Sequence, residues 1–322
     1  MSRFKFHMQV INHPFHQSKC PICSDSNFQA GWVIGNNGLN LQIIKNVAII
    51  GNELFESVFS YCSSCDFAYF FPRPSEAFIN DFYLKGGGRE ELPSDSVLIS
   101  QIQSMSSGLD VSTVFSILKS AGIDNKEFKD LRVLEIGPGT SIFAPAFKDL
   151  GMEYWANEIG IETGDFLERS FGAKLIRQPL DKIPGIYNEK FDLIFSKDSL
   201  EHHLYPLESI NAIIRLLKAN GLLVLSVPNL HSHSFKLTSV NHPYFAFPPH
   251  LNYFSENTFK KILENFGLEN IFIKSFCFPS EIFYCMELCI KLGLVFPDEH
   301  YLREISDLGK NERLLISARK KP

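Results

Sequence analysis

The sequence predicts an α/β protein built on a doubly wound, mostly parallel sheet of seven strands, with a small β-rich module near the N-terminus. From residue 131 onward, apolar strand-like runs alternate with helical stretches, which is typical of a parallel sheet covered by helices. A glycine-rich turn follows the first of these strands. Two Cys-x-x-Cys pairs stand upstream, in a segment rich in β-forming residues.

The pattern of apolar residues predicts each element in turn. The helix expected at 206–221 begins with Pro206, a residue favoured at the first helical position, and repeats apolar side chains at Ile210, Ile213, Ile214 and Leu217. The other helices are expected at 93–121, 141–151, 162–172 and 256–267. Strands are expected at 41–50, 67–71, 132–136, 153–159, 173–178, 191–196, 222–227, 268–276 and 313–320.

Three consecutive glycines, Gly86 to Gly88, form the clearest break along the chain. They separate the cysteine-bearing segment from everything that follows. We therefore expect a module of residues 1–85, a linker and helical segment of residues 86–130, and a main domain of residues 131–322.

Composition limits the classes of partner. The 322 residues carry a net charge of −5, which argues against nucleic acid or an anionic membrane, because both require a concentrated basic surface. No apolar signal-peptide core is visible at the N-terminus, and no run approaches the roughly 18 apolar residues of a spanning helix. A cytoplasmic protein is expected, and its oligomeric state is not predicted. The odd count of seven cysteines does not suggest a disulfide framework.

The glycine-rich turn has the sequence Glu-Ile-Gly-Pro-Gly-Thr at residues 135–140. It is not a Walker loop, and the third glycine of a dinucleotide fingerprint is replaced by Ile142. Gly137 and Gly139 would let the backbone approach a ligand closely. A second acidic residue is expected at the end of the next strand to bind ribose hydroxyls, and Glu158 stands 19 residues after Gly139.

The loop resembles motif I of class I S-adenosylmethionine-dependent methyltransferases. The resemblance extends over residues 131–267 and includes an EH…P signature at Glu201, His202 and Pro206. It implies a Rossmann-like fold and S-adenosylmethionine as cofactor, with Glu135 able to orient the loop and to face the cationic amino acid part of the ligand. The implied cofactor-binding residues are Glu135, Gly137, Pro138, Gly139, Thr140, Glu158, Ile159, Leu180, Asp181 and Ser196.

The two Cys-x-x-Cys pairs, Cys20–Cys23 and Cys62–Cys65, are separated by 38 residues. Two such pairs supply the four thiolates of a tetrahedral Zn²⁺ site, and a complete set of four predicts a structural metal. His13 and His16 would then be surplus. The surrounding sequence is similar to the N-terminal zinc module of a methyltransferase group that includes sugar C-methyltransferases. That group adds a third, C-terminal domain that this chain does not match.

The acceptor pocket is expected over the carboxyl ends of the fourth and fifth strands, with the aromatic- and histidine-rich segment 229–255 as a lid. His250 is the first candidate for general base, because it matches a histidine of the sugar C-methyltransferases. The neighbouring Glu and Tyr of that group are replaced by Pro249 and Phe247, which favours methylation of oxygen over carbon. His202 is the second candidate.

Other histidines and cysteines are expected to be structural. We place His203, His231 and His233 at the surface or in the lid, and Cys285 and Cys289 in packing contacts. The favoured function is methyl transfer to a small molecule, a sugar or a nucleotide-linked sugar. Two alternatives stay open: an RNA methyltransferase, which the equal count of seven basic and seven acidic residues in 1–90 disfavours, and a non-catalytic scaffold.

Overall fold

The computed structural model describes residues 19–26, 28–33, 58–71, 73–87, 92–106, 119, 128–232, 235, 242, 244, 249–276 and 311–322. Several expectations lie outside these residues. They are the strand at 41–50, the second half of the helix at 93–121, His13, His16, His233, Phe247, Cys285 and Cys289. Within the described ranges, every helix is too short or too polar to cross a membrane.

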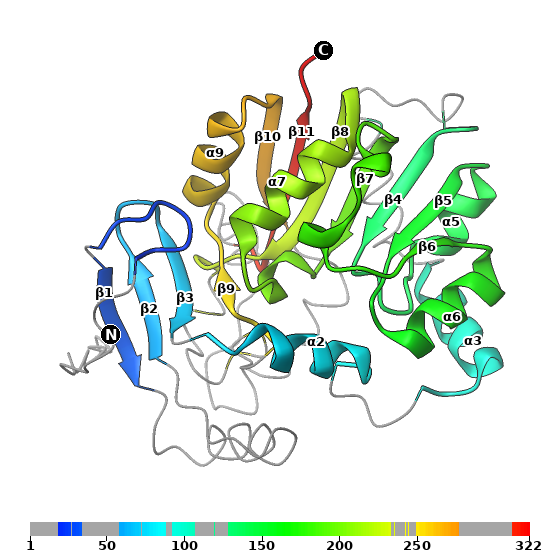
Figure 1. The fold of residues 1–322 in the computed structure, drawn as a ribbon, viewed down its shortest axis with the longest axis horizontal. Helices are drawn as coiled ribbons and strands as arrows, with labels where there is room; N and C mark the ends of the chain where they lie inside the picture. The colour runs from blue at the N-terminus through cyan, green and yellow to red at the C-terminus, as the bar shows by residue number, and fades with distance from the viewer. Residues whose placement is uncertain are drawn as a thin grey trace, which may run out of the picture.

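A seven-stranded sheet forms the centre of the molecule, in the order β10-β11-β8-β7-β4-β5-β6 (Figure 1). The five strands from β6 to β8 in this order run parallel, while β11 pairs antiparallel with both β8 and β10. The prediction of a doubly wound, mostly parallel sheet is therefore confirmed. Its strands are β4 (Arg132–Ile136), β5 (Glu153–Asn157), β6 (Lys174–Ile176), β7 (Phe191–Lys197), β8 (Leu217–Pro228), β10 (Glu269–Phe276) and β11 (Arg313–Arg319).

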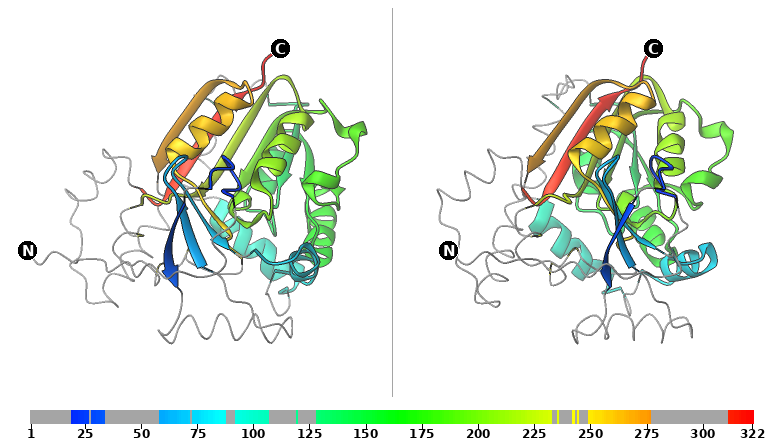
Figure 2. Two further views of the ribbon diagram at one scale, coloured as in Figure 1. Left: turned by 60° about the vertical axis from the view of Figure 1, so that its left-hand side comes forward. Right: turned by 90° about the vertical axis from the view of Figure 1, so that its left-hand side faces the viewer.

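Helices cover both faces of this sheet (Figure 2). Successive strand residues point to opposite faces, so in β4 Val133 and Leu134 belong to two different apolar clusters. The cluster of Leu134 includes side chains of α7 (Pro206–Leu216) and α9 (Glu256–Asn265). The cluster of Val133 includes side chains of α3 (Asp95–Ser106), α5 (Ala144–Asp149) and α6 (Ile161–Phe171).

The helix predicted for 206–221 is shorter than expected. It ends at Leu216, and Leu217 already has the extended conformation of β8, with φ −69° and ψ 138°. Tertiary hydrogen bonds override the helical pattern here, because Glu189 and Lys190 donate to the carbonyls of Arg215 and Leu216. The last carbonyls of the helix are therefore held by the neighbouring strand segment instead of a further turn.

A second sheet of four strands has the order β1-β2-β3-β9. Its first three strands are β1 (Phe28–Val33), β2 (Val58–Cys62) and β3 (Phe67–Phe71), and its fourth is β9 (Asn252–Tyr253). We refer to the antiparallel strands β1, β2 and β3 as the N-terminal hairpins. β9 comes from the segment that follows β8, so β3 of these hairpins pairs with a much later part of the chain (Figure 1). Thr258, in the first turn of α9, adds hydrogen bonds to the carbonyls of Cys65 and Asp66.

One helix connects the two sheets. α2 (Glu76–Leu84) begins at Ser75, whose side chain accepts from the amide of Phe78, and it ends before the turn at Gly86 and Gly87. It buries Ile79 and Phe82 and runs below the central sheet (Figure 1). Three short 3₁₀ turns follow in the main domain: η1 (Leu180–Lys182), η2 (Gly185–Tyr187) and η3 (Leu200–His202).

Candidate active site

A cavity of about 360 Å³ opens at the carboxyl ends of the parallel strands β4, β5 and β7. Ile136 and Asn157 end β4 and β5, and Asp198 follows β7 directly. This edge is where open α/β sheets bind their ligands. The opposite wall is formed by α2, through Ile79 and Tyr83, so the helix that follows the N-terminal hairpins closes the site.

The glycine loop meets the cavity with backbone that only glycine adopts easily. Gly137 and Gly139 both have φ of +57°. A Cβ on Gly137 would also lie 2.2 Å from Oγ of Ser199. Two independent constraints, conformation and space, therefore require glycine at this position.

Glu135 lies at the end of β4 beneath the glycine loop and is not among the described residues that line the cavity. Its carboxylate is 2% exposed and accepts hydrogen bonds from the hydroxyls of Ser141 (2.7 Å) and Tyr154 (2.8 Å). Burial raises the pKa of Glu135 to about 7, although both bonds oppose the shift. These contacts agree with the expectation that Glu135 orients the loop, whereas its expected contact with the ligand stays a prediction. The hydroxyl oxygen of Ser141 also accepts from the amides of Phe143 and Ala144, where α5 begins.

Glu158 joins the loop to the second strand. One carboxylate oxygen accepts from the amide of Gly139 at 3.0 Å, and the other accepts from the amide of Gly160 at 2.7 Å. Its side chain also lines the cavity. The carboxylate is therefore fixed beside the glycine loop, at the end of β5, where a ribose-binding acid is expected.

Most of the residues predicted to bind the cofactor meet at this cavity. The lining includes Gly137, Gly139, Glu158, Ile159, Leu180, Asp181 and His202. Pro138, Thr140 and Ser196 lie outside the lining that the described residues form. The hydroxyl of Ser196 is buried between neighbouring strands and donates to the carbonyl of Ile136 at 3.3 Å.

Two features of the lining were not predicted. Tyr83 of α2 lines the cavity, and its buried hydroxyl has no hydrogen-bond partner among the described residues. His203, expected at the surface or in the lid, lines the cavity between the hydroxyls of Ser199 (3.2 Å) and Ser209 (2.8 Å). No sequence pattern indicated Tyr83, because its helix lies within the segment expected to form the zinc module.

The two candidate base residues lie together. The rings of His202 and His250 are 4.8 Å apart between centroids, and His202 lines the cavity while His250 lies beside it. Burial lowers the pKa of His202 to about 4 and that of His250 to about 3, so both imidazoles are neutral at pH 7. Glu201 completes the cluster with a fully buried carboxyl, whose pKa burial raises to about 8. Glu201 belongs to the EH…P signature, but the sequence pattern did not predict that it would be buried.

Comparison with known proteins decides the class of enzyme. Residues 113–272 match a family model described as a methyltransferase domain, and the match covers the glycine loop, Glu158 and the EH…P signature. The chain is an S-adenosylmethionine-dependent methyltransferase. A search of curated protein sequences gives no match.

Several solved structures are similar to this methyltransferase. Phosphoethanolamine N-methyltransferase 2 of Haemonchus contortus has a TM-score of 0.50 at 15% identity, over 79% of this chain and 62% of that one. A possible histamine N-methyltransferase of Thermotoga maritima has a TM-score of 0.44 at 21% identity, over 60% and 83%. A methyltransferase of Archaeoglobus fulgidus has a TM-score of 0.45 at 18% identity, over 76% and 100%.

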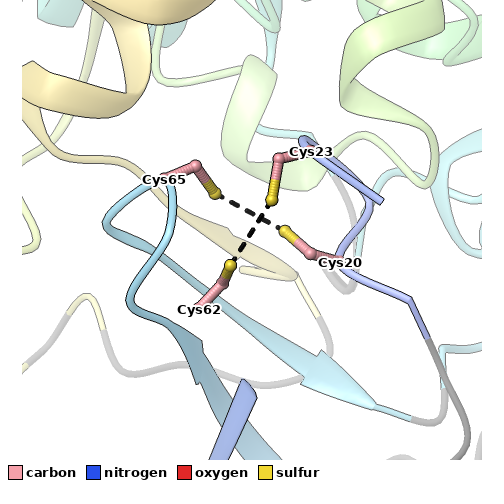
Figure 3. Close-up of side chains that lie close together, drawn as sticks. All are labelled: Cys20, Cys23, Cys62 and Cys65. Carbon is pink, nitrogen blue, oxygen red and sulfur yellow. Dashed lines mark hydrogen bonds between the residues drawn. The ribbon is translucent and has the colours of Figure 1, made fainter. Parts of the chain in front are cut away.

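The four cysteines of the methyltransferase form a compact cluster (Figure 3). The sulfurs of Cys20 and Cys65 are 3.6 Å apart, those of Cys23 and Cys62 are 3.5 Å apart, and all four lie within 4.8 Å of one another. Zn–S bonds of about 2.3 Å in a tetrahedron place neighbouring sulfurs about 3.8 Å apart. Two of the sulfur separations are close to this value, so the four side chains are grouped as a Cys₄ zinc site requires.

A half-buried arginine connects the N-terminal strands to the histidine cluster. Arg73, just after β3, donates to the carbonyl of Leu204 and to the side-chain oxygen of Asn252, each at 2.7 Å. Asn252 in turn donates to the carbonyls of Glu201 (3.1 Å) and His203 (2.7 Å). This pair braces the turn that carries Glu201 and His202 against β9.

Proposed function

We propose that this methyltransferase transfers the methyl group of S-adenosylmethionine to an oxygen of a small molecule, with a sugar or nucleotide-linked sugar as the favoured acceptor. The observation that carries the proposal is the cavity, which brings Gly137, Gly139, Glu158 and His202 to one site. Its volume of about 360 Å³ suits a small molecule. The sugar class rests on the similarity of the cysteine module to that of sugar methyltransferases.

The cofactor roles follow from the lining. Glu158 accepts one backbone amide with each oxygen and lines the cavity at the end of β5, and we assign it to the ribose hydroxyls. Gly137 and Gly139 let the loop approach the methionine part of the ligand closely. Leu180 and Asp181 in η1 are assigned to the adenine, as the family resemblance implies.

The acceptor lies, in this proposal, next to His202 and His250. Methyl transfer requires the acceptor oxygen, the methyl carbon and the sulfur in line, and the hydroxyl must lose its proton. Neutral imidazoles can accept that proton, so His250 and His202 stay the candidate bases. Their low pKa values make them weak bases, however, and a sugar hydroxyl would need further activation.

We also propose that Cys20, Cys23, Cys62 and Cys65 hold one structural Zn²⁺. Four cysteine ligands leave no coordination position for a substrate, so the metal would stabilise the fold and take no part in the chemistry. Cys20, Cys62 and Cys65 are buried in one apolar cluster with Phe67 and Tyr69, so a metal bound there would add to the stability of this packed region.

Calorimetry with S-adenosylmethionine and S-adenosylhomocysteine tests the cofactor assignment. We expect one molecule bound per chain, and a loss of affinity of about 100-fold or more in Gly137→Ala, whose methyl group would meet Ser199. Gly172→Ala is the matched control, since Gly172 has a similar φ of +69° but nothing within 4 Å of the added methyl. A folded protein that binds neither ligand would overturn the proposal in favour of a scaffold.

The acceptor class is tested separately, by mass spectrometry. Free sugars, nucleotide sugars and short RNA are incubated with the enzyme and S-adenosylmethionine, and products are searched for one added methyl group. We expect a methylated sugar derivative and no methylated RNA. Methylation of RNA alone would replace the small-molecule proposal with the RNA alternative.

A further inference from the structure

We propose that Glu201, His202 and His250 form a binding site for a divalent transition-metal cation beside the cofactor cavity, with coordination positions left open for an oxygen of the acceptor. The three residues offer one ligand atom each, and these atoms lie within 4.8 Å of one another. Two imidazoles and one carboxylate are a donor set that binds Mn²⁺, Fe²⁺, Co²⁺ or Zn²⁺.

The hydrogen bonds of both histidines leave the correct nitrogen free. Nδ1 of His202 lies 2.6 Å from the carbonyl oxygen of Pro249, and Nδ1 of His250 lies 2.7 Å from that of Tyr244. A carbonyl oxygen can only accept, so each Nδ1 carries the proton and each Nε2 presents a lone pair. Metal-binding histidines are typically held in this way, with the other ring nitrogen donating to a carbonyl.

The carboxyl of Glu201 is the strongest indication of a missing ligand. It is fully buried, and neither of its oxygens has a hydrogen-bond partner within the described part of the chain. A buried carboxyl without partners is costly whether it is charged or protonated, and such groups are rare in folded proteins. A cation bound between Glu201 and the two imidazoles would satisfy it.

A hydrogen bond within the cluster does not provide the missing partner. The closest approach of Glu201 to His202 is 4.0 Å between Oε1 and Nε2, which is too long for a hydrogen bond. Ligands bonded to one cation at about 2.1 Å stand roughly 3.0–3.5 Å apart. Side-chain movements of about 1 Å would therefore bring the three donors to coordination distance.

A backbone hydrogen bond holds the segment of His250 next to Glu201 and His202, although the two segments are distant in sequence. The amide of Leu251 donates to the carbonyl of Glu201 at 2.9 Å, so the segment before β9 is tied to η3. His250 is also connected to the cavity on its other side: Tyr244, whose carbonyl it bonds, receives a hydrogen bond from Arg313, and Arg313 pairs with Asp198 in the lining. The ligands are thus held by packed neighbours, as metal sites require.

The catalytic use of this site rests on the proposed function, whereas metal binding itself does not. An acceptor hydroxyl coordinated to the cation loses its proton to solvent water more readily, because the metal stabilises the alkoxide. A lone pair of that oxygen then forms the bond to the methyl carbon. The carbon–sulfur bond breaks with its electron pair staying on sulfur, which yields S-adenosylhomocysteine. The metal replaces the weak histidine bases in this scheme, and His202 and His250 act as its ligands.

Titration with Mn²⁺ tests the site. The full chain is purified with zinc in its Cys₄ cluster, treated with EDTA to remove weakly bound ions and titrated with Mn²⁺ by calorimetry and electron paramagnetic resonance. We expect one Mn²⁺ per chain, and affinity weaker by about 100-fold or more in Glu201→Gln and in His250→Gln. His231→Gln is the matched control, because this half-exposed histidine pairs with Asp66 outside the cluster and its variant should bind Mn²⁺ normally.

A measurement on the unaltered protein keeps the test independent of how the variants fold. Pulsed electron paramagnetic resonance of the Mn²⁺ complex should show couplings to imidazole nitrogen. Absence of these couplings, absence of bound Mn²⁺, or full affinity in both variants would overturn the proposed site. S-adenosylmethionine binding is measured in parallel: its failure with Mn²⁺ binding intact would reject the proposed function and leave the metal site standing.

Discussion

The two clusters of metal-binding side chains in this methyltransferase differ in how they are assembled. The cysteine cluster combines two short turns, each of which supplies two ligands at a fixed spacing of three residues. The cluster of Glu201, His202 and His250 combines two neighbours in η3 with a residue that lies 48 positions further along the chain. The first cluster is encoded locally, and the second exists only when the main domain is folded.

The number of ligands and the position of each cluster suggest different roles. Four cysteines complete a tetrahedral site, whereas Glu201 and the two histidines leave positions open. His202 lines the cavity, while none of the four cysteines does so within the described lining. A closed site away from the cavity suits a structural metal, and an open site at its wall suits chemistry. Arg73, which follows β3, ties the N-terminal strands to the segment after Glu201 by donating to the carbonyl of Leu204.

The largest effect is expected from breaking the closed cluster. Cys62→Ala removes one of four ligands, so we expect zinc content to fall from about one per chain to well below one. The free energy of unfolding should fall by several kcal/mol, because metal binding energy is folding energy in such modules. Elemental analysis and urea denaturation measure both quantities.

The control for this change is Ser63→Ala, next to Cys62 in the same turn, where the side chain is exposed and is not a ligand. It should keep its zinc and its stability. If Cys62→Ala retained a full complement of zinc, or lost zinc with no change in stability, the cluster would not be a structural metal site.

An intermediate effect is expected from removing the link between the two regions. Arg73→Met removes the donor from the partly buried oxygens of Leu204 and Asn252, which should cost about 2 kcal/mol of stability. The turn of Glu201 and His202 loses its brace, so Mn²⁺ affinity should fall about 10-fold while zinc is retained.

Arg169→Met is the matched control for the arginine. Arg169 forms an exposed ion pair with Asp95, at 3.2 Å, and such pairs contribute under about 1 kcal/mol. The stability and Mn²⁺ affinity of this variant should stay close to those of the parent protein. An unchanged Mn²⁺ affinity in Arg73→Met would show that the open cluster does not depend on the hairpin region.

Features that depend on local sequence could be predicted. The alternation of strands and helices predicted the central sheet, and the spacing of glycine and glutamate predicted that Gly137, Gly139 and Glu158 meet at one edge. The cysteine spacing predicted the cluster of four sulfurs. Each of these depends on short-range geometry, such as period, turn conformation or the fixed edge of a parallel sheet.

Features that depend on tertiary contacts could not be predicted. β9 has two residues and is recognisable only by its pairing with β3. Tyr83 lines the cavity because α2 packs below the sheet, which no periodicity specifies. The helix α7 ends early because Glu189 and Lys190 bond its last carbonyls. The burial of Glu201 follows in the same way from surroundings assembled from distant segments.

The smallest expected effect is the pH dependence of stability that Glu135 causes. It tests whether burial alone, without the loss of hydrogen-bond partners, perturbs a carboxyl group of this protein as we infer for Glu201. Glu135 is buried like Glu201, but it accepts from Ser141 and Tyr154. Burial raises its pKa from 4.5 to about 7, so the folded state binds the proton more tightly than the unfolded state. Stability should therefore fall as pH rises from 4.5 through 7, by about 3 kcal/mol, and level off above that range.

Glu135→Gln removes this titration and keeps an oxygen that can accept both hydroxyls. We expect its stability to match that of the parent protein within about 1 kcal/mol at pH 4.5, and to decline less on approach to pH 7. Urea denaturation of both proteins across this range measures the difference, in which the other titrating groups cancel. Identical slopes would mean that Glu135 titrates normally despite its burial. Burial alone would then be a poor guide to the state of Glu201, and the case for a cation there would depend entirely on its missing partners.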